Sequence, residues 1–147
     1  MIKSLAFILF MLVLAVEIGI AQTKTDCSNY LNYENKNQVD PKPLRLSIVL
    51  GSVEDVQGVS IPDVCLAIFT ESGKLVTQVT SDENGKFAFS AVPAGEYRLV
   101  AKYSPFCTAN VPIEVIEKDK RGKSKQRKVV VHMKPAGIDE CSFGELK

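Results

Sequence analysis

Apolar and polar residues alternate along most of the chain after residue 43, a pattern that predicts β-strands with one buried face. The clearest example is the segment 86–103. Phe87 and Phe89 alternate with small or polar residues, and the alternation resumes after Val92-Pro93-Ala94-Gly95 with Tyr97. Because Pro cannot donate to a strand ladder and Gly frees the backbone, this segment predicts a strand, a turn and a second strand.

The same alternation predicts further short strands that begin near Leu44, Val64, Leu75, Val111 and Val129. Turn residues separate these segments, and none of them has the period of an amphipathic helix, so we expect an all-β fold of about seven strands. Alternation, in contrast to unbroken apolar runs, favours antiparallel sheets, and two such sheets packed face to face make a β-sandwich. Its expected core residues are Leu46, Ile48, Leu66, Ile68, Phe87, Phe89, Tyr97 and Leu99.

The first 21 residues have the features of a secretory signal peptide. Lys3 precedes an apolar run that continues to Val16, and Gly19-Ile20-Ala21 places small residues where a signal peptidase cleaves. A retained anchor is the alternative, but Glu17 ends the run before the roughly 20 apolar residues that usually span a bilayer. We therefore expect cleavage after residues 1–21 and a secreted or periplasmic protein.

The remainder has the size of one domain with short extensions. Residues 22–42 are polar and rich in Asn, which predicts an irregular N-terminal arm, and Pro41 and Pro43 forbid a helix at its end. The sandwich is expected over residues 43–135. Residues 136–147 are then a C-terminal tail.

Charge and residue types limit the chemistry that we expect. Lys and Arg number 18 against 17 Asp and Glu, so the overall field steers the chain neither to nucleic acid nor to membranes. His132 is the only histidine and alternates with apolar neighbours, so a catalytic base or a zinc site is not expected. Asp82-Glu83-Asn84-Gly85 resembles the start of a calcium loop, but Phe87 and Phe89 stand where later ligands are needed. We expect no cofactor and no enzymatic activity.

Four cysteines in an exported chain favour two disulfides. Three pairings are possible for Cys27, Cys65, Cys107 and Cys141, and we favour Cys27 with Cys141 and Cys65 with Cys107. Each bridge would close a long loop and add about 2–4 kcal/mol to stability. The strand alternation turns Cys65 outward, which favours a partner in a loop or tail. The alternative is that some cysteines stay free as small buried residues.

The segment 117–128, which we call the basic connection, carries an excess of positive charge between two predicted strands. A solvated hairpin tip explains such a run, and its charges also discourage edge-to-edge aggregation. The functional alternative is contact with a polyanion, such as an acidic polysaccharide or membrane headgroups; no aromatic residue is present to stack on bases, so specific nucleic-acid recognition is not expected. The basic residues are Lys118, Lys120, Arg121, Lys123, Lys125, Arg127 and Lys128.

Four motifs occur in order along the predicted sandwich: Gly51-x-Val53, Gly58-x-x-Ile61-Pro62-Asp63-Val64, the run from Thr80 to Phe89, and the run from Val92 to Tyr97. The segment that carries them resembles the carboxypeptidase regulatory-like domain, a prealbumin-like (transthyretin-like) Greek-key sandwich related to the Cna protein B-type domains. These motifs are turns and core positions, so they predict fold better than function. The resemblance implies a non-catalytic module that serves exported proteins as an accessory, adhesive or substrate-binding part.

We therefore expect an exported, non-catalytic module that binds a protein or glycan partner or gives structural support at the cell envelope. Binding is expected from an exposed edge strand or from loops at the ends of the sandwich, namely Glu54–Gly58, Ser104–Asn110 and the basic connection. Electrostatic adhesion through the basic connection is one alternative. A transthyretin-like hydrolase is the other, although relatives of that kind use several histidines and this chain has only His132.

Overall fold

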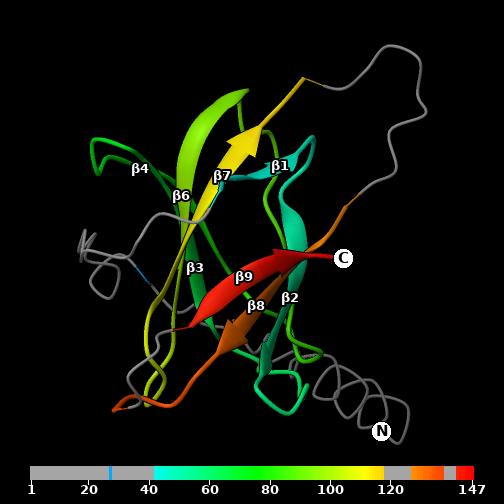
Figure 1. Cartoon of the computed structure of the whole chain (residues 1–147), viewed down its shortest axis with the longest axis vertical. Helices are drawn as coiled ribbons and strands as arrows, with labels where there is room; N and C mark the ends of the chain where they lie inside the picture. The colour runs from blue at the N-terminus through cyan, green and yellow to red at the C-terminus, as the bar shows by residue number, and fades with distance from the viewer. Residues whose placement is uncertain (1–26, 28–41, 118–126, 138–141) are drawn as a thin grey trace, which may run out of the picture.

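The computed structural model describes residues 27, 42–117, 127–137 and 142–147 (Figure 1). Within them, no helix is long and apolar enough to cross a membrane. The expected signal peptide, most of the N-terminal arm and most of the basic connection lie outside the described residues. The described chain forms nine strands, β1 (Leu44–Leu46), β2 (Leu50–Asp55), β3 (Cys65–Thr70), β4 (Leu75–Thr80), β5 (Lys86–Ala88), β6 (Gly95–Lys102), β7 (Ala109–Val115), β8 (Val129–Met133) and β9 (Phe143–Leu146).

Two sheets make up the fold (Figure 1). The larger has the strand order β1-β7-β6-β3-β4, and the smaller has the order β5-β2-β8-β9. An apolar cluster with members from both sheets fills the space between them, as in a β-sandwich. The expected all-β sandwich is therefore confirmed.

The sheets are mixed, so the prediction of a purely antiparallel sandwich was wrong. β1 pairs with β7 in parallel, and β2 pairs with β8 in parallel, whereas the other neighbouring strands are antiparallel. The alternation of side chains reports that one face of a strand is buried, but it carries no information about the direction of the neighbouring strand. The number of strands also exceeds the expected seven, in part because the predicted tail contributes β9.

The predicted first strand is divided into β1 and β2, which lie in different sheets. The backbone bends at Ser47 and Ile48, and the buried positions become Leu46 and Val49. This bend shifts the alternation by one residue, because the chain leaves the five-stranded sheet and enters the four-stranded one. Ile48 is consequently only half-buried. Val49 takes the core position that we expected Ile48 to fill.

The core between the sheets contains most of the residues expected there. Leu66, Ile68 and Leu99 are fully buried, and Leu46, Phe87 and Phe89 are at most 5% exposed. Tyr97 is half-buried and packs against this cluster from β6. The two phenylalanine rings lie edge to face with their centroids 6.0 Å apart, an arrangement that aromatic pairs prefer.

A second, smaller cluster lies outside the main core. It contains Cys65, Ala67 and Phe69 of β3, which alternate with the inward-facing residues of that strand, together with Val100 of β6 and Cys27. These side chains point away from the four-stranded sheet, as the alternation predicts, yet all of them are buried. β3 is therefore covered on both faces.

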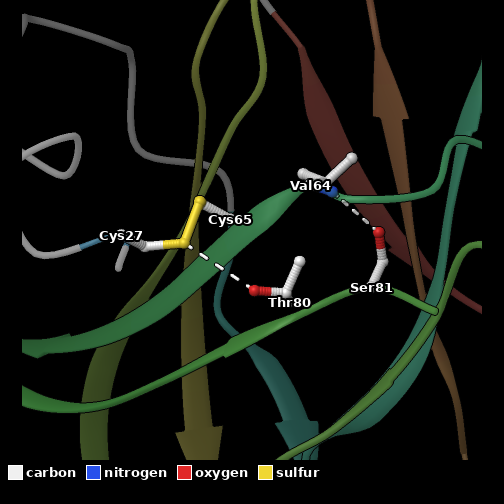
Figure 2. The surroundings of a disulfide bond; sticks show 5 residues. All are labelled: Cys27, Val64, Cys65, Thr80 and Ser81. Atoms are coloured by element: carbon white, nitrogen blue, oxygen red, sulfur yellow. Dashed lines mark hydrogen bonds between the residues drawn. A yellow bond between two sulfur atoms is a disulfide. The ribbon is translucent and has the colours of Figure 1, made fainter. Parts of the chain in front are cut away.

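A disulfide joins Cys27 to Cys65, with the two Cα atoms 5.7 Å apart (Figure 2). The favoured pairings of Cys27 with Cys141 and of Cys65 with Cys107 were wrong. Cys65 points outward, as expected, but its partner is Cys27 of the N-terminal arm and not Cys107 of the connection between β6 and β7. Cys107 is also disulfide-bonded, and Cys141 lies outside the described residues.

Candidate functional site

Two of the three expected loops meet at one end of the sandwich. β2 ends at Asp55 beside Met133 of β8, and the chain beyond β8 places Pro135 in a β-bridge with Phe106. The connection from β2 to β3 (residues 55–64), the connection from β6 to β7 (103–108) and residues 134–137 therefore lie together (Figure 1). We call this surface the loop end.

The turn that follows β2 presents two aliphatic side chains to solvent. Val56 and Val59 are 59% and 58% exposed, the highest values among the large hydrophobic residues that the structure describes as exposed. Between them, Gly58 adopts a φ of 83°, a conformation that glycine reaches without steric cost. The sequence Val-Gln-Gly-Val thus becomes a tip with an apolar residue on each side.

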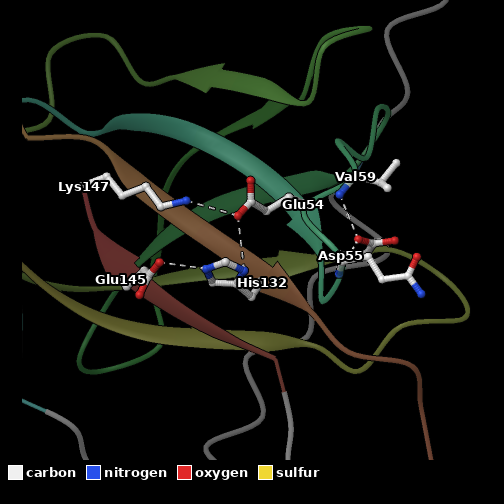
Figure 3. Close-up of polar contacts among 7 residues, drawn as sticks. Glu54, Asp55, Val59, His132, Glu145 and Lys147 are labelled. Atoms are coloured by element: carbon white, nitrogen blue, oxygen red, sulfur yellow. Dashed lines mark hydrogen bonds and ion pairs between the residues drawn. The ribbon is translucent and has the colours of Figure 1, made fainter.

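Hydrogen bonds from Asp55 fix this turn. Its Oδ1 accepts from the backbone N–H groups of Gln57 (2.8 Å) and Val59 (2.9 Å; Figure 3). The backbone N–H of Asp55 also donates to the carbonyl of Val59, and that of Gly58 donates to the carbonyl of Asp55. Because the backbone is already held in place, the two valines would lose little conformational entropy on contact with a partner.

The connection from β6 to β7 is also held at several points. The ring of Phe106 stacks on that of Tyr103, with the ring centroids 6.2 Å apart. The backbone N–H of Cys107 donates to the carbonyl of Lys134 (2.7 Å). These contacts tie the connection to the segment that follows β8.

Ser142, the residue before β9, strengthens the same junction. Its side chain is buried, its hydroxyl donates to the carbonyl of Cys107 (2.6 Å), and its Oγ accepts from the backbone N–H of Lys134 (2.8 Å). A buried hydroxyl that makes both bonds satisfies three polar groups at once. The loop end is therefore a rigid surface on which Val56 and Val59 project.

Arg127 and Lys128, the basic residues of this connection that the structure describes, lie at the opposite end of the sandwich. β8 begins at Val129 beside Gly51, near the start of β2, and the two strands are parallel. Arg127 and Lys128 are exposed immediately before β8, whereas Lys118, Lys120, Arg121, Lys123 and Lys125 lie outside the described residues. The structure consequently separates Arg127 and Lys128 from the other two candidate loops.

His132 lies on the outer face of β8, between two carboxylates (Figure 3). Its Nε2 is 3.1 Å from Oε1 of Glu145, its Nδ1 is 3.4 Å from Oε1 of Glu54, and Nζ of Lys147 is 3.4 Å from the same Glu54 oxygen. The imidazole also stacks on the ring of Phe143 at 4.8 Å. A histidine that activates a nucleophile directs one ring nitrogen to a hydroxyl or thiol, whereas both nitrogens here face carboxylates.

The side chain of Asp82 stabilises the turn before β5. Its Oδ1 accepts from the backbone N–H groups of Asn84 (2.9 Å) and Lys86 (2.8 Å), and Gly85 adopts a φ of 70°. The oxygen that a calcium loop would direct to a metal is therefore engaged by the turn. Among the described residues, no group of three or more His, Cys, Asp or Glu side chains converges on a metal position.

A shallow groove of about 480 Å³ lies where the edge strands β4 and β5 face each other across the sandwich. Phe87 and Val79 contribute apolar surface to it, and Asp82 and Lys86 lie beside them. Leu75, at the start of β4, is 41% exposed. A β-bulge beside Ile68 interrupts the pairing of β4 with β3, and bulges at edge strands hinder the addition of another strand. The loop end is therefore the stronger candidate.

Sequence reasoning anticipated the loop Glu54–Gly58 but not its two exposed valines, of which Val59 lies one residue beyond the expected boundary. The signal was present as an apolar pair around Gln-Gly, directly after an Asp that can cap a turn. Alternation alone assigns such valines to a strand. Only the turn geometry shows that they face solvent.

Comparison with known proteins identifies the family but no activity. The fold is similar to that of the 5-hydroxyisourate hydrolase of Klebsiella pneumoniae, at 16% identity over 69% of this chain and 99% of that chain, with a TM-score of 0.49. It is also similar to 3-chlorocatechol 1,2-dioxygenase from Rhodococcus opacus 1CP, at 13% identity over 75% of this chain and 59% of that chain, with a TM-score of 0.39. No curated protein sequence matches the chain.

The sequence itself gives the stronger match. Residues 48–125, more than half of the chain, match the carboxypeptidase regulatory-like domain, and they include strands β2 to β7. The four motifs that suggested this resemblance lie at the turns and core positions of the observed sandwich. The chain therefore belongs to the carboxypeptidase regulatory-like domain family.

Proposed function

We propose that this chain is an exported, non-catalytic module that binds a protein partner through the loop end. The observation that carries the proposal is the pair Val56 and Val59, which are more than half exposed on a turn with a fixed backbone. Single exposed valines are common, but two on one preorganised tip offer a contiguous apolar contact.

A protein partner fits this surface better than a glycan does. The cores of protein interfaces are apolar and exclude water, and burial of each valine would contribute about 1–2 kcal/mol. A glycan presents hydroxyl groups, which gain nothing from aliphatic side chains. Within the loop end, Tyr103 and Phe106 are partly buried and stack on each other, so their rings are not open platforms.

Two observations support a non-catalytic role. The chain has a single histidine, and both of its ring nitrogens face the carboxylates of Glu54 and Glu145. The regulatory-like family also suits a module that acts through a partner. A hydrolase would need further groups that neither the sequence nor the surroundings of His132 supply.

Export is supported by the N-terminal pattern and by the Cys27–Cys65 disulfide, since disulfides persist in oxidising compartments. N-terminal sequencing of the protein purified from its source tests this part. A mature chain that begins at Gln22 is expected, and an intact Met1 on the purified protein would contradict it.

Site-specific photo-cross-linking tests the binding surface. A benzophenone amino acid at position 56 is expected to give one discrete adduct with another protein in the source cells, and Val59→Ser should suppress it. The same probe at Leu75, which is apolar and 41% exposed on another surface, is the matched control and should give no such adduct. Equal adducts from both positions would reject the loop end as the binding surface.

A further inference from the structure

Negative charge is concentrated beside the two exposed valines of the loop end. The connection from β2 to β3 (residues 55–64) contains Asp55 and Asp63, and the turn before β5 (residues 81–85) contains Asp82 and Glu83. Neither segment contains Lys, Arg or His, although the whole chain has a net charge of +1. These two segments therefore carry carboxylates without a cation of their own.

The fold brings the two segments into contact. The backbone N–H of Asp63 donates to the carbonyl of Ser81 (3.2 Å), which ties the end of one segment to the start of the other. The packing is close, because a Cβ added at Gly85 would lie 3.2 Å from Cβ of Ser60, the residue after Val59. The turn before β5 therefore lies against the valine-bearing part of the loop end.

The side chains of these acidic residues are available to a partner. Asp63, Asp82 and Glu83 are exposed, and Asp55 is half-buried. Within the parts of the chain that the structure describes, none of the four forms an ion pair. Oδ1 of Asp55 and Oδ1 of Asp82 accept backbone N–H groups, and these bonds hold the two turns in place.

Three lysines close to this end of the sandwich lie on other surfaces. Lys86 alternates with the buried Phe87, so it lies on the outer face of the smaller sheet. Lys102 lies on the outer face of the larger sheet, in register with Cys65, and makes a contact there. Nζ of Lys134 lies 5.3 Å from the centroid of the Phe143 ring. These lysines leave the carboxylates beside the valines unpaired.

We infer that the partner of the loop end presents basic residues around the apolar site that receives Val56 and Val59. This inference rests on the proposed function and names the chemistry of the partner. Charges of opposite sign at the rim of an interface attract the two proteins before contact, and like charges oppose them. The same carboxylates repel anionic headgroups and acidic polysaccharides, so a protein with a positively charged rim fits this surface best.

The apolar and the charged residues should act on different steps of binding. Charges at the rim of an interface change mainly the rate of association, because their attraction extends into the solvent. Buried apolar contacts change mainly the rate of dissociation, because they form only after docking. The inference therefore predicts that loss of the carboxylates slows association and leaves dissociation nearly unchanged.

Binding kinetics of the protein that cross-links to position 56, measured on the immobilised full chain, test this prediction. Asp63→Asn combined with Glu83→Gln removes two of the charges and leaves both turns held by Asp55 and Asp82. Asn suits position 63, where φ is 57°, because it adopts positive φ more readily than most residues do. In about 0.1 M salt we expect the association rate constant to fall by about 3- to 10-fold and the dissociation rate constant to change by less than about twofold.

Glu96→Gln combined with Glu117→Gln is the matched control. Both residues are exposed, and they lie toward the opposite end of the sandwich, where β6 begins and β7 has ended. This control removes the same amount of charge from the chain. It should change neither rate constant, because the inference concerns charge beside the valines and not the net charge of the protein.

The salt dependence of the wild-type chain is a second measurement, which needs no folded variant. Salt at about 1 M shortens the screening length from about 10 Å to about 3 Å. We expect the association rate constant to fall at least about fivefold between about 0.1 M and about 1 M salt. A rate that stays constant or rises would overturn the inference.

The outcomes separate this inference from the proposed function. If the adduct at position 56 forms but the Asp63→Asn, Glu83→Gln variant associates as fast as the control or faster, the basic rim is overturned and binding through the loop end stands. If no adduct forms at position 56, both are overturned.

Discussion

Gly51→Ala tests the parallel pairing of β2 with β8, because the backbone of Val129 in β8 occupies the space that a Cβ at Gly51 would need. It is in register with Val129 of β8 on one side and with Phe87 of β5 on the other. A Cβ at this position would overlap the carbonyl oxygen of Val129 and would lie 2.7 Å from its carbonyl carbon. It would also lie 3.1 Å from Cζ of Phe87. The substitution therefore forces two paired strands apart.

The expected loss is at the upper end of the range for an overpacked core. Such substitutions cost about 1–3 kcal/mol, and here the obstacle is backbone, which yields less than the end of a side chain. We expect the free energy of unfolding to fall by about 3 kcal/mol. For a domain of this size, that loss corresponds to a decrease in Tm of about 10 °C.

Urea denaturation followed by far-UV circular dichroism measures this change. Ser52→Ala, one residue along β2 and on its outer face, is the control and should change the free energy of unfolding by less than about 0.5 kcal/mol. An unchanged m-value would show that both variants unfold from the same native state. If Gly51→Ala were as stable as Ser52→Ala, the close approach of β2 and β8 would be refuted.

Three further predictions concern the disulfide, the histidine and the basic connection. Cys27→Ala combined with Cys65→Ala should lower the free energy of unfolding by about 4 kcal/mol in urea denaturation, since the bridge spans 38 residues; a loss below about 1 kcal/mol would contradict a stabilising bridge. His132→Gln breaks a partly exposed contact with Glu54, so we expect the free energy of unfolding to fall by less than about 1 kcal/mol in the same assay. A much larger loss would show a structural role beyond this contact. The basic connection predicts salt-sensitive retention on heparin; replacement of its Lys and Arg residues with Gln should abolish that retention, and unchanged retention would exclude polyanion contact through this segment.

The strands were predictable because burial on one face leaves a period of two in the sequence. Phe87 and Phe89 show this most clearly, since each is buried between two exposed neighbours in the sequence. The direction of pairing was not predictable in the same way. β1 and β2 each have a parallel neighbour far away in the sequence, and no local pattern reports such a neighbour.

The position of Ile48 shows a second limit. A bend of two residues between β1 and β2 exchanges inward and outward positions, so Val49 becomes buried and Ile48 does not. Neither Ile48 nor Val49 has a conformational preference that would predict the bend. Alternation is reliable within a strand and fails where the chain moves from one sheet to the other.

The disulfide pairing was not predictable because no local pattern in the sequence places Cys27 beside Cys65, 38 residues away. The outward direction of Cys65 was correct and favoured a partner in a loop or tail, but it did not distinguish Cys27 from the other cysteines. The loop end was partly predictable. Asp55 and Gly58 predict a turn from the sequence. The exposure of Val56 and Val59 follows only from the hydrogen bonds and backbone conformation of that turn.

The most direct test of the account is the affinity for the protein that cross-links to position 56, measured by calorimetry with the wild-type chain and with Val56→Ser combined with Val59→Ser. If the two valines supply an apolar contact, their loss should raise Kd by about 30- to 150-fold, which corresponds to a loss of about 2–3 kcal/mol in binding free energy. Leu75→Ser should leave Kd unchanged. A double variant that binds as tightly as the wild type would contradict binding through the loop end.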